Sequence, residues 1–136
     1  MLNGLDDVIH VVGNLGNQDD ICAARDAGIT AVIASDIAVI RACRRKGVEV
    51  HISTQCNISN TEAVRFYAEW ADVVVLAREL NLDQVRAIAD AIDRENITGP
   101  RGEKVKIEMF CHGALCMAVS GKCYLSLHEI CFLYTS

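Results

Sequence analysis

The sequence predicts an α/β protein of parallel strands and helices that forms part, about half, of a (β/α)8 TIM-like barrel. Short apolar, β-branched runs alternate with longer amphipathic segments, the pattern of successive strand–helix–strand units. Residues 73–77 are continuously apolar, as in a strand buried on both faces of a sheet. The chain has 136 residues, one Pro and no low-complexity linker, so its length allows one domain.

The N-terminal segment leads to two expectations. Residues 1–17 are ambiguous, and Gly13, Asn14 and Gly16 favour a loop or turn there. Residues 18–27 are expected to form a helix that stops at Gly28, because glycine commonly follows the last helical residue.

The first clear strand–helix unit covers residues 31–46. Residues 31–34 are predicted to form a short strand, and residues 37–46 a helix. Asp36 has the position and chemistry of an N-cap, and Gly47 stands just past the helix end.

The second unit covers residues 48–70. Residues 48–53 are predicted to form a strand, and a helix is expected from about Thr61 to Trp70. Ser59 and Glu62, three residues apart, have the spacing of a capping box.

The third unit pairs the strand at residues 73–77 with a helix at about residues 82–95. Asn81 and Gln84 stand at capping positions of that helix. Turn-forming residues follow, and residues 104–110 are predicted to form a fourth strand.

Two architectures fit this alternation, a doubly wound sheet and a (β/α)8 barrel. A complete barrel needs about 250 residues, so about four strands amount to half of one. A half barrel has two unpaired strand edges and an exposed apolar interior. We therefore expect the chain to associate with itself through its exposed sheet edges.

Composition limits the classes of function. The net charge of −5, from 13 basic and 18 acidic residues, argues against a surface that grips nucleic acid by charge alone, but not against an RNA enzyme with a local patch. No apolar run is long enough to cross a bilayer, and the acidic N-terminus lacks the basic start of an export signal. We expect a cytoplasmic protein that does not bind membranes.

Polar side chains follow every predicted strand. Because active sites of parallel α/β folds lie at the carboxyl ends of the strands, these residues are the candidates for a site. They are Ser35 and Asp36 after the first strand, Ser53, Thr54, Gln55, Cys56 and Asn57 after the second, Arg78 and Glu79 after the third, and Cys111, His112 and Cys116 after the fourth.

Each candidate also has an ordinary structural interpretation. Ser53, Thr54 and Gln55 are either normal loop polarity or substrate-binding groups. Arg78 and Glu79 are either a solvated ion pair or, for Arg78, a fork that binds an anionic substrate. His112, Arg78 and Glu79 are the catalytic candidates, whereas His51, inside a strand, is interpreted as structural.

The seven cysteines fall into groups. Cys22 and Cys43 lie within predicted helices, where packing is the default role of a free cysteine. Cys116 and Cys123 bracket a likely turn at Ser120–Gly121, and their spacing suits two thiolates on one iron or zinc ion. The spacing is not that of a zinc ribbon, so buried structural thiols remain the alternative.

Three segments in this order carry a family resemblance. They are His-Ile-Ser-Thr-Gln at residues 51–55, Val-Leu-Ala-Arg-Glu-Leu at residues 75–80, and His-Gly-Ala-Leu-Cys-Met-Ala-Val-Ser-Gly-Lys-Cys at residues 112–123. From about residue 27 to residue 129 the chain closely resembles the collagenase-like peptidase family, peptidase family U32.

The resemblance implies a (β/α)8-like catalytic domain. The family was named for proteolysis, but some relatives are implicated in hydroxylating tRNA or rRNA, some with prephenate, and others in ubiquinone synthesis. Those relatives carry a four-iron, four-sulfur cluster on four cysteines. Two of the four match Cys116 and Cys123, and the other two would lie beyond residue 136.

The two ends depart from the family pattern. Residues 1–17 match it poorly, residues 18–129 form the partial barrel domain, and residues 130–136 diverge, so Cys131 is not a family ligand. We interpret the chain as an internal piece of such a protein. Three functions stay open: an iron–sulfur RNA hydroxylase, a peptidase, or an inactive remnant.

Overall fold

The computed structural model describes residues 8–11, 18–112 and 118–122 of the chain. The elements in chain order are β1 (Val8–Val11), α1 (Gln18–Asp26), β2 (Ala31–Ala34), α2 (Ile37–Lys46), β3 (Glu49–Ile52), the short 3-10 helix η1 (Thr54–Cys56), α3 (Thr61–Ala68), β4 (Val73–Val75), α4 (Leu82–Glu95) and β5 (Lys106–Glu108).

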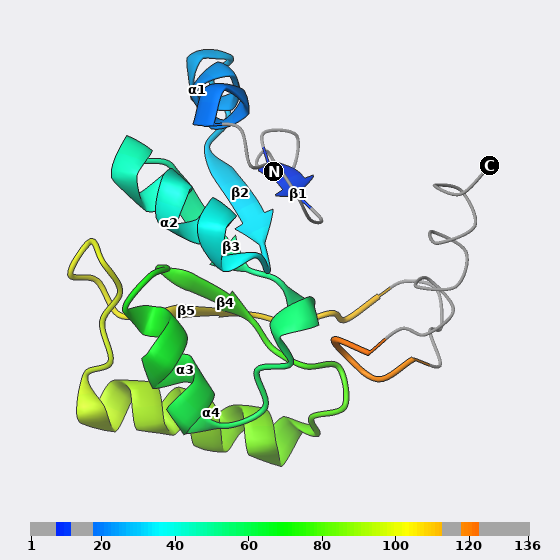
Figure 1. Cartoon of the computed structure of the whole chain (residues 1–136). Helices are drawn as coiled ribbons and strands as arrows, with labels where there is room; N and C mark the ends of the chain where they lie inside the picture. Colours follow the sequence, from blue (N-terminus) through cyan, green and yellow to red (C-terminus); the bar gives the residue numbers. More distant parts are fainter. Residues whose placement is uncertain (1–7, 12–17, 113–117, 123–136) are drawn as a thin grey trace.

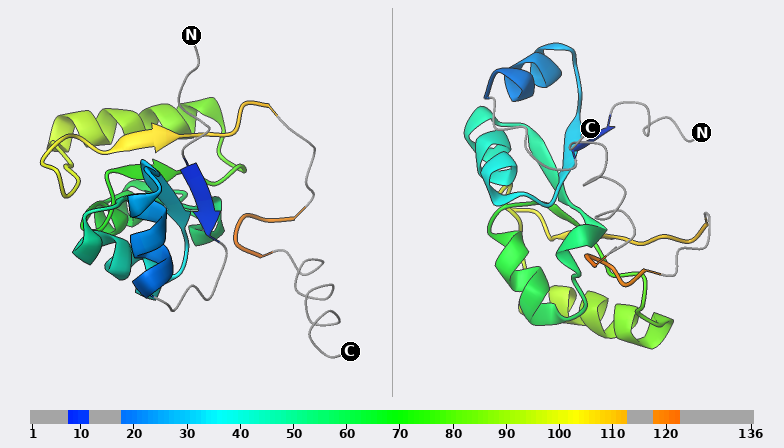
Figure 2. Two further views of the ribbon diagram at one scale, coloured as in Figure 1. Left: turned by 90° about the horizontal axis from the view of Figure 1, so that it is seen from above. Right: turned by 45° about the vertical axis from the view of Figure 1, so that its right-hand side comes forward.

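The five strands of the described residues form one parallel sheet in the order β1-β2-β3-β4-β5. The four α-helices of the described residues lie along one side of this curved sheet (Figures 1 and 2). The α/β class, the parallel pairing and the order of the four predicted strands are therefore confirmed. The arrangement is consistent with part of a (β/α)8 barrel, and the barrel itself stays a prediction.

One strand was missed. The sequence pattern of residues 1–17 is ambiguous, but the structure has a strand at Val8–Val11, which pairs in parallel with β2 so that Val8 lies opposite Ala31. The glycine and asparagine residues that suggested a turn come after this strand, at positions 13, 14 and 16. The strand is also favoured by its own sequence, because Val8, Ile9 and Val11 are β-branched residues.

The helix ends confirm most of the expected caps. The Asp36 carboxylate accepts hydrogen bonds from the backbone N–H groups of Ala38 and Val39 at 2.8 and 3.1 Å. Gly47 ends α2 in the left-handed conformation at φ 71°. Asn81 and Gln84 form a reciprocal capping box at the start of α4.

The expected capping box at Ser59 is wrong. Asn60 is the N-cap of α3, and its side-chain oxygen accepts from the Ala63 backbone N–H at 2.9 Å. The third helical position is therefore Ala63, so Glu62 is one residue too early to complete the box and pairs with Arg65 instead. The helix also ends at Ala68, two residues before the expected end.

Alternation along the strands gives the sheet two different faces. The face toward the helices is apolar, and its side chains belong to the main buried cluster: Val32, Ala34, Val50, Ile52 and Val74. The helices add buried side chains to the same cluster, among them Val39, Val64, Ile88 and Ile92. Burial of this apolar surface is the main stabilising contribution to the fold.

The opposite face carries charged groups on β3 and β5. His51 lies between two carboxylates, with its Nδ1 3.0 Å from Glu108 and its Nε2 3.4 Å from Glu49. Glu49 also accepts from the Arg101 guanidinium at 2.6 Å. The charges on this face therefore form a connected chain from Arg101 to Glu108 that spans β4.

The apolar face gives a direct test of the core. Val74 is fully buried at the centre of β4, whereas Ile37 on α2 is 58% exposed. Val74→Asp buries a charge without a partner, so we expect it to cost several kcal/mol and to abolish cooperative unfolding. Ile37→Asp is the control and should keep a cooperative transition in urea, followed by circular dichroism. A wild-type transition in Val74→Asp would contradict this account of the core.

The two edges of the sheet give a test of self-association. Among the described strands, β1 and β5 each have one neighbour, so their outer hydrogen-bonding groups are open to another chain. We expect the purified chain to form dimers or larger species in light scattering. A monomer at every concentration tested would contradict this expectation.

Candidate functional site

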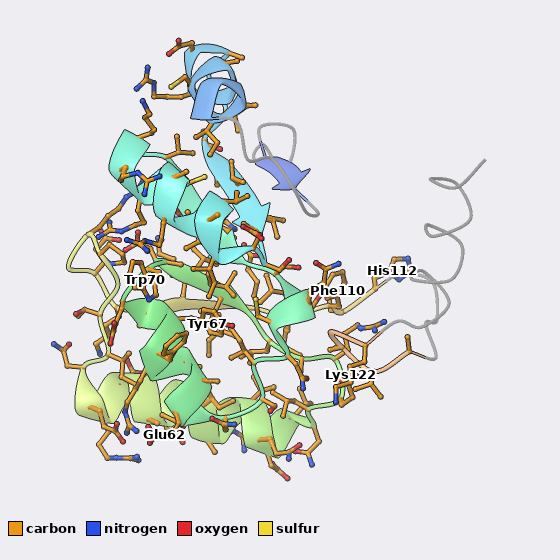
Figure 3. The ribbon with its side chains drawn as sticks, viewed as in Figure 1. Glu62, Tyr67, Trp70, Phe110, His112 and Lys122 are labelled. Atoms are coloured by element: carbon orange, nitrogen blue, oxygen red, sulfur yellow. The ribbon has the colours of Figure 1, made fainter. Side chains whose placement is uncertain are left out.

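The carboxyl ends of the parallel strands meet at one rim of the sheet, where β2, β3 and β4 lead into the polar segments singled out above. His112 and Lys122 lie at the same end of the molecule, away from Glu62 and Trp70 (Figure 3). The candidate functional site is this rim.

The exits of β2 and β3 are joined by side-chain hydrogen bonds. The Ser35 hydroxyl donates to Gln55 Oε1 at 2.8 Å. Ser53 is buried, and its hydroxyl oxygen accepts from the Gln55 backbone N–H at 3.3 Å. Thr54, the first residue of η1, is half-buried. Three of the predicted polar residues, Ser35, Ser53 and Gln55, are therefore in contact.

Cys56 lies in the same corner and is held as a neutral thiol. Its Sγ is 3.8 Å from the carbonyl oxygen of Ser35, to which it donates. Burial raises the pKa of the Cys56 thiol. Burial, and next the hydrogen bond with Cys56, raises the pKa of Tyr67 to about 12. Because the thiolate is the nucleophile, these surroundings do not activate Cys56.

The exit of β4 holds a segment from far along the chain. The Arg78 guanidinium donates to the carbonyl oxygen of Ala118 at 2.8 Å, and the Arg78 backbone N–H donates to the Ser120 hydroxyl at 3.2 Å. The Glu79 carboxylate accepts from the Ser120 backbone N–H at 2.7 Å. This hydrogen bond lowers the pKa of Glu79. Ser120 is only 2% exposed.

The same segment makes a close turn against the β3 exit. The Lys122 backbone N–H donates to the carbonyl oxygen of Val119 at 2.9 Å. Between them Gly121 has φ +80°, and a Cβ atom built there would lie 2.4 Å from the carbonyl oxygen of Gln55. Only glycine fits this position without displacing backbone. We call residues 118–122 the seated turn.

The other predicted site residues are less closely joined. His112 and Cys111 are exposed at the end of the segment that follows β5. Cys116 and Cys123, the predicted cluster ligands, lie outside the described residues. Among the described residues no group of three His, Cys, Asp or Glu side chains has the geometry to hold a metal ion.

The two cysteines on helices, Cys43 and Cys22, are buried to different extents. Cys43 is fully buried in the core, and burial raises the pKa of its thiol. Cys22 on α1 is half-buried.

Sequence reasoning named Arg78 and Glu79 but missed their partner. Ser120 is 42 and 41 positions away from them, and no local pattern signals such a contact. The one available signal was the Ser120–Gly121 pair itself, which predicted a turn without indicating what the turn contacts.

The residues that build this rim lie within one family match. Residues 16–129, which hold β2 to β5 and the seated turn, match the family model described as peptidase family U32. The chain belongs to peptidase family U32. No solved structure matches the chain.

U32 relatives carry names from two kinds of chemistry. The chain is 68% identical over 109 residues to a protein named collagenase from Porphyromonas gingivalis, covering 80% of this chain and 26% of the relative. It is 40% identical over 116 residues to tRNA hydroxylation protein P1 of Bacillus subtilis, covering 83% and 25%. It is 42% identical over 100 residues to the 23S rRNA 5-hydroxycytidine C2501 synthase of Escherichia coli, covering 73% and 14%.

The chain therefore spans about a quarter or less of the length of these three relatives. Within the described part of this U32 chain, no helix is both long and apolar enough to cross a membrane.

The chain of charges on the face opposite the helices gives a pH prediction. Burial opposes the charged form of His51, but the hydrogen bond and charge of Glu108, with Glu49, outweigh it and raise the pKa of His51 above its ordinary value of 6.5. The stabilisation is thus fully present below the ordinary pKa and is lost as the pH rises through the raised pKa. We expect the urea concentration at the unfolding midpoint of the wild type to fall as the pH rises through the raised pKa of His51. In His51→Gln the same midpoint should not change over this pH interval.

His112→Gln is the matched control because His112 is exposed and not part of this chain of charges. It should keep the wild-type pH dependence. An unchanged pH dependence in His51→Gln would refute the assignment to His51.

Proposed function

We propose that the protein to which this chain contributes is an iron–sulfur-dependent enzyme that hydroxylates tRNA or rRNA. One observation carries the proposal: the turn between Cys116 and Cys123 is seated at the carboxyl rim of the sheet by Arg78 and Glu79. In parallel α/β proteins that rim is where reactive groups are placed. Two relatives named for tRNA and rRNA hydroxylation are 40% and 42% identical to the chain.

The proposed cluster is a four-iron, four-sulfur cluster. Cys116 and Cys123 would supply two thiolates, which are the ligands that such clusters use. The rest of the ligand set would come from elsewhere in the whole protein. The buried Ser120 and the close approach at Gly121 fit this proposal, because they fix the chain between the two thiols. When bound, the cluster would supply electron transfer to the reaction.

The remaining rim residues have proposed roles in binding and catalysis. Ser53, Thr54 and Gln55 form the polar floor that would bind substrate, and Arg78 offers a cation to an anionic group such as prephenate or an RNA phosphate. His112, Arg78 and Glu79 are the groups proposed to handle protons. With an RNA substrate, the proposed place of action is the cytoplasm.

The second candidate is a genuine peptidase, and the 68% identity to a collagenase favours it. The rim offers less support for that chemistry. Cys56 is kept neutral, and among the described residues neither His51 nor His112 makes a hydrogen bond to a Ser or Cys side chain. An activated nucleophile needs such a base. An inactive remnant is the third possibility.

The cluster proposal has a spectroscopic test. The chain is joined to the C-terminal continuation of the Porphyromonas gingivalis relative and reconstituted with iron and sulfide without oxygen. Cys116→Ser and Cys123→Ser should each abolish the visible absorption of the cluster. Cys22→Ser and Cys111→Ser, at half-buried and exposed thiols, are the controls and should keep it. Equal iron content in all four variants would remove Cys116 and Cys123 from the ligand set.

The substrate proposal has its own test. The same joined protein is expressed in a bacterium that lacks its own U32 RNA hydroxylases, and digested tRNA and rRNA are analysed by mass spectrometry. We expect a hydroxylated nucleoside that disappears with Cys116→Ser. Cleavage of casein or gelatin by the purified protein, without any hydroxylated nucleoside, would favour the peptidase instead.

A further inference from the structure

An apolar groove lies between α2 and α3, on the helix side of the sheet (Figure 1). It has a volume of about 60 Å³, and its lining side chains are all aliphatic or aromatic: Ile37, Ile40, Phe66, Tyr67 and Trp70. Ile37 is 58% exposed and Phe66 is 53% exposed. Exposed apolar side chains that gather around one hollow, and are not scattered singly, are typical of an interaction surface.

The groove is separate from the rim. Trp70 lies away from His112 and Lys122 (Figure 3). None of the polar residues at the strand exits lines the groove. A molecule bound between α2 and α3 would therefore leave the strand exits free, so the groove serves a different purpose from the site at the rim.

The size of the groove fits one aliphatic side chain. A volume of about 60 Å³ holds about four to six water-sized groups, because each needs about 10–15 Å³. A leucine or methionine side chain is of this size. Two neighbouring helices also leave a furrow in which the apolar stripe of a third helix can lie. The shape therefore suits an amphipathic helix that inserts one side chain.

The charges on α2 indicate the sign of the partner. Arg41 follows Ile37 by four positions, so the two share one face of the helix. Arg44 follows Ile40 in the same way. Both arginines are exposed, and neither forms an ion pair within the described part of the chain.

Other arginines on helices differ from this pair. Each arginine on the other described α-helices forms an ion pair: Arg25, Arg65, Arg86 and Arg94. The chain as a whole has a net charge of −5, so cations without a partner are unusual in it. Arginines of this kind beside an apolar groove favour a partner that carries carboxylates.

The α3 side of the groove carries the opposite sign. Glu69 follows Phe66 by three positions and is exposed, with no ion pair among the residues that the structure describes. Glu62 precedes Phe66 by four positions and pairs with Arg65. A nucleic acid is negative along its whole length, so these carboxylates oppose it. A helix can carry carboxylates on one edge and neutral or basic side chains on the other, and it fits both sides.

The U32 relatives contain enough further polypeptide to supply such a helix. The chain spans 26%, 25% and 14% of the three relatives described above. Stable complexes between separate proteins bury about 800 Å² on each partner, far more than a groove for one side chain provides. A segment tethered to the same polypeptide has a high effective concentration and needs a smaller contact. Size and tethering together favour a partner from the rest of the same polypeptide.

We propose that the groove between α2 and α3 is the docking site of an amphipathic helix, acidic along one edge, from the part of the U32 polypeptide outside this chain. An aliphatic side chain of that helix fills the hollow beside Phe66 and Trp70. Its carboxylates pair with Arg41 and Arg44. The docking depends on the length of U32 proteins and not on the reaction at the rim.

The first measurement is hydroxyl-radical labelling, which reports the exposure of single side chains by mass spectrometry. Residues 18–122 of this chain replace the matching segment of the Porphyromonas gingivalis relative, to which the chain is 68% identical. In this hybrid the labelling rate of Phe66, relative to the denatured protein, should be about a tenth, as for a buried side chain. An open groove would give about half, because Phe66 is 53% exposed in the chain.

Charge reversal on α2 tests the acidic edge. In the hybrid, Arg41→Glu combined with Arg44→Glu should repel the docked helix and raise the labelling of Phe66 about fivefold, toward that of the open groove. Arg86→Glu, at an exposed arginine on α4, is the matched control and should leave the labelling of Phe66 unchanged. Circular dichroism checks that each variant keeps its helices.

A cross-link identifies the partner segment. Arg41→Lys keeps the positive charge and offers an amine, which a carbodiimide joins directly to a carboxylate in contact with it. Mass spectrometry of the digested hybrid should find this lysine linked to an acidic peptide from outside residues 18–122. Arg86→Lys, beside Asp83, is the control and should give no link outside these residues.

Several outcomes would overturn the docking site. Phe66 labelled in the hybrid at about half the denatured rate shows that nothing covers the groove. Protection that increases with protein concentration assigns the groove to a second copy, and protection that requires added single-stranded RNA assigns it to nucleic acid. A link from Arg41→Lys only to residues 18–122 removes the external helix. None of these measurements needs a cluster or a hydroxylated product, so their failure leaves the proposed function untouched.

Discussion

Parallel pairing between strands that follow one another in the chain is the constraint on which the rest of the structure depends. Each strand must be connected to the next by a crossover, and here the crossovers carry the helices along one side of the sheet. The apolar alternate positions, such as Val50 and Ile52, then have one direction in which to be buried. The same constraint brings all strand exits to one rim and puts charged groups of β3 and β5 on the other face of the sheet, beside the buried Val73 and Val75 of β4.

The two faces of the sheet differ in the interactions that they hold. The helix side holds the main buried apolar cluster, whereas the opposite side holds His51 between Glu49 and Glu108. In this arrangement the half-buried His51 has a carboxylate partner on each ring nitrogen. At the rim, the Glu79 carboxylate accepts from the backbone N–H of the buried Ser120, and the Arg78 guanidinium donates to the Ala118 carbonyl oxygen, 41 and 40 positions away.

Local chemistry predicted most of the fold. Asp36 and Gly47, like Asn81 and Gln84, lie next to the helix ends that they cap, so their effect is visible within a few residues of sequence. The prediction of a cap at Ser59 was wrong because Asn60, one residue later, is an equally good cap. The strand β1 was missed although its β-branched residues favour a strand, because Gly13, Asn14 and Gly16 close behind it favour a turn. The contact of Ser120 with Glu79 joins residues 41 positions apart, which no local pattern shows.

The strand order also sets how the chain folds during synthesis. Because each strand pairs with the one made just before it, the sheet can grow strand by strand as the chain leaves the ribosome, with short loops to close at every step. The turn at Ser120 is the exception, since it docks on β3 and β4 exits that were made long before. Docking of this turn therefore has to follow the formation of both strand exits that it contacts.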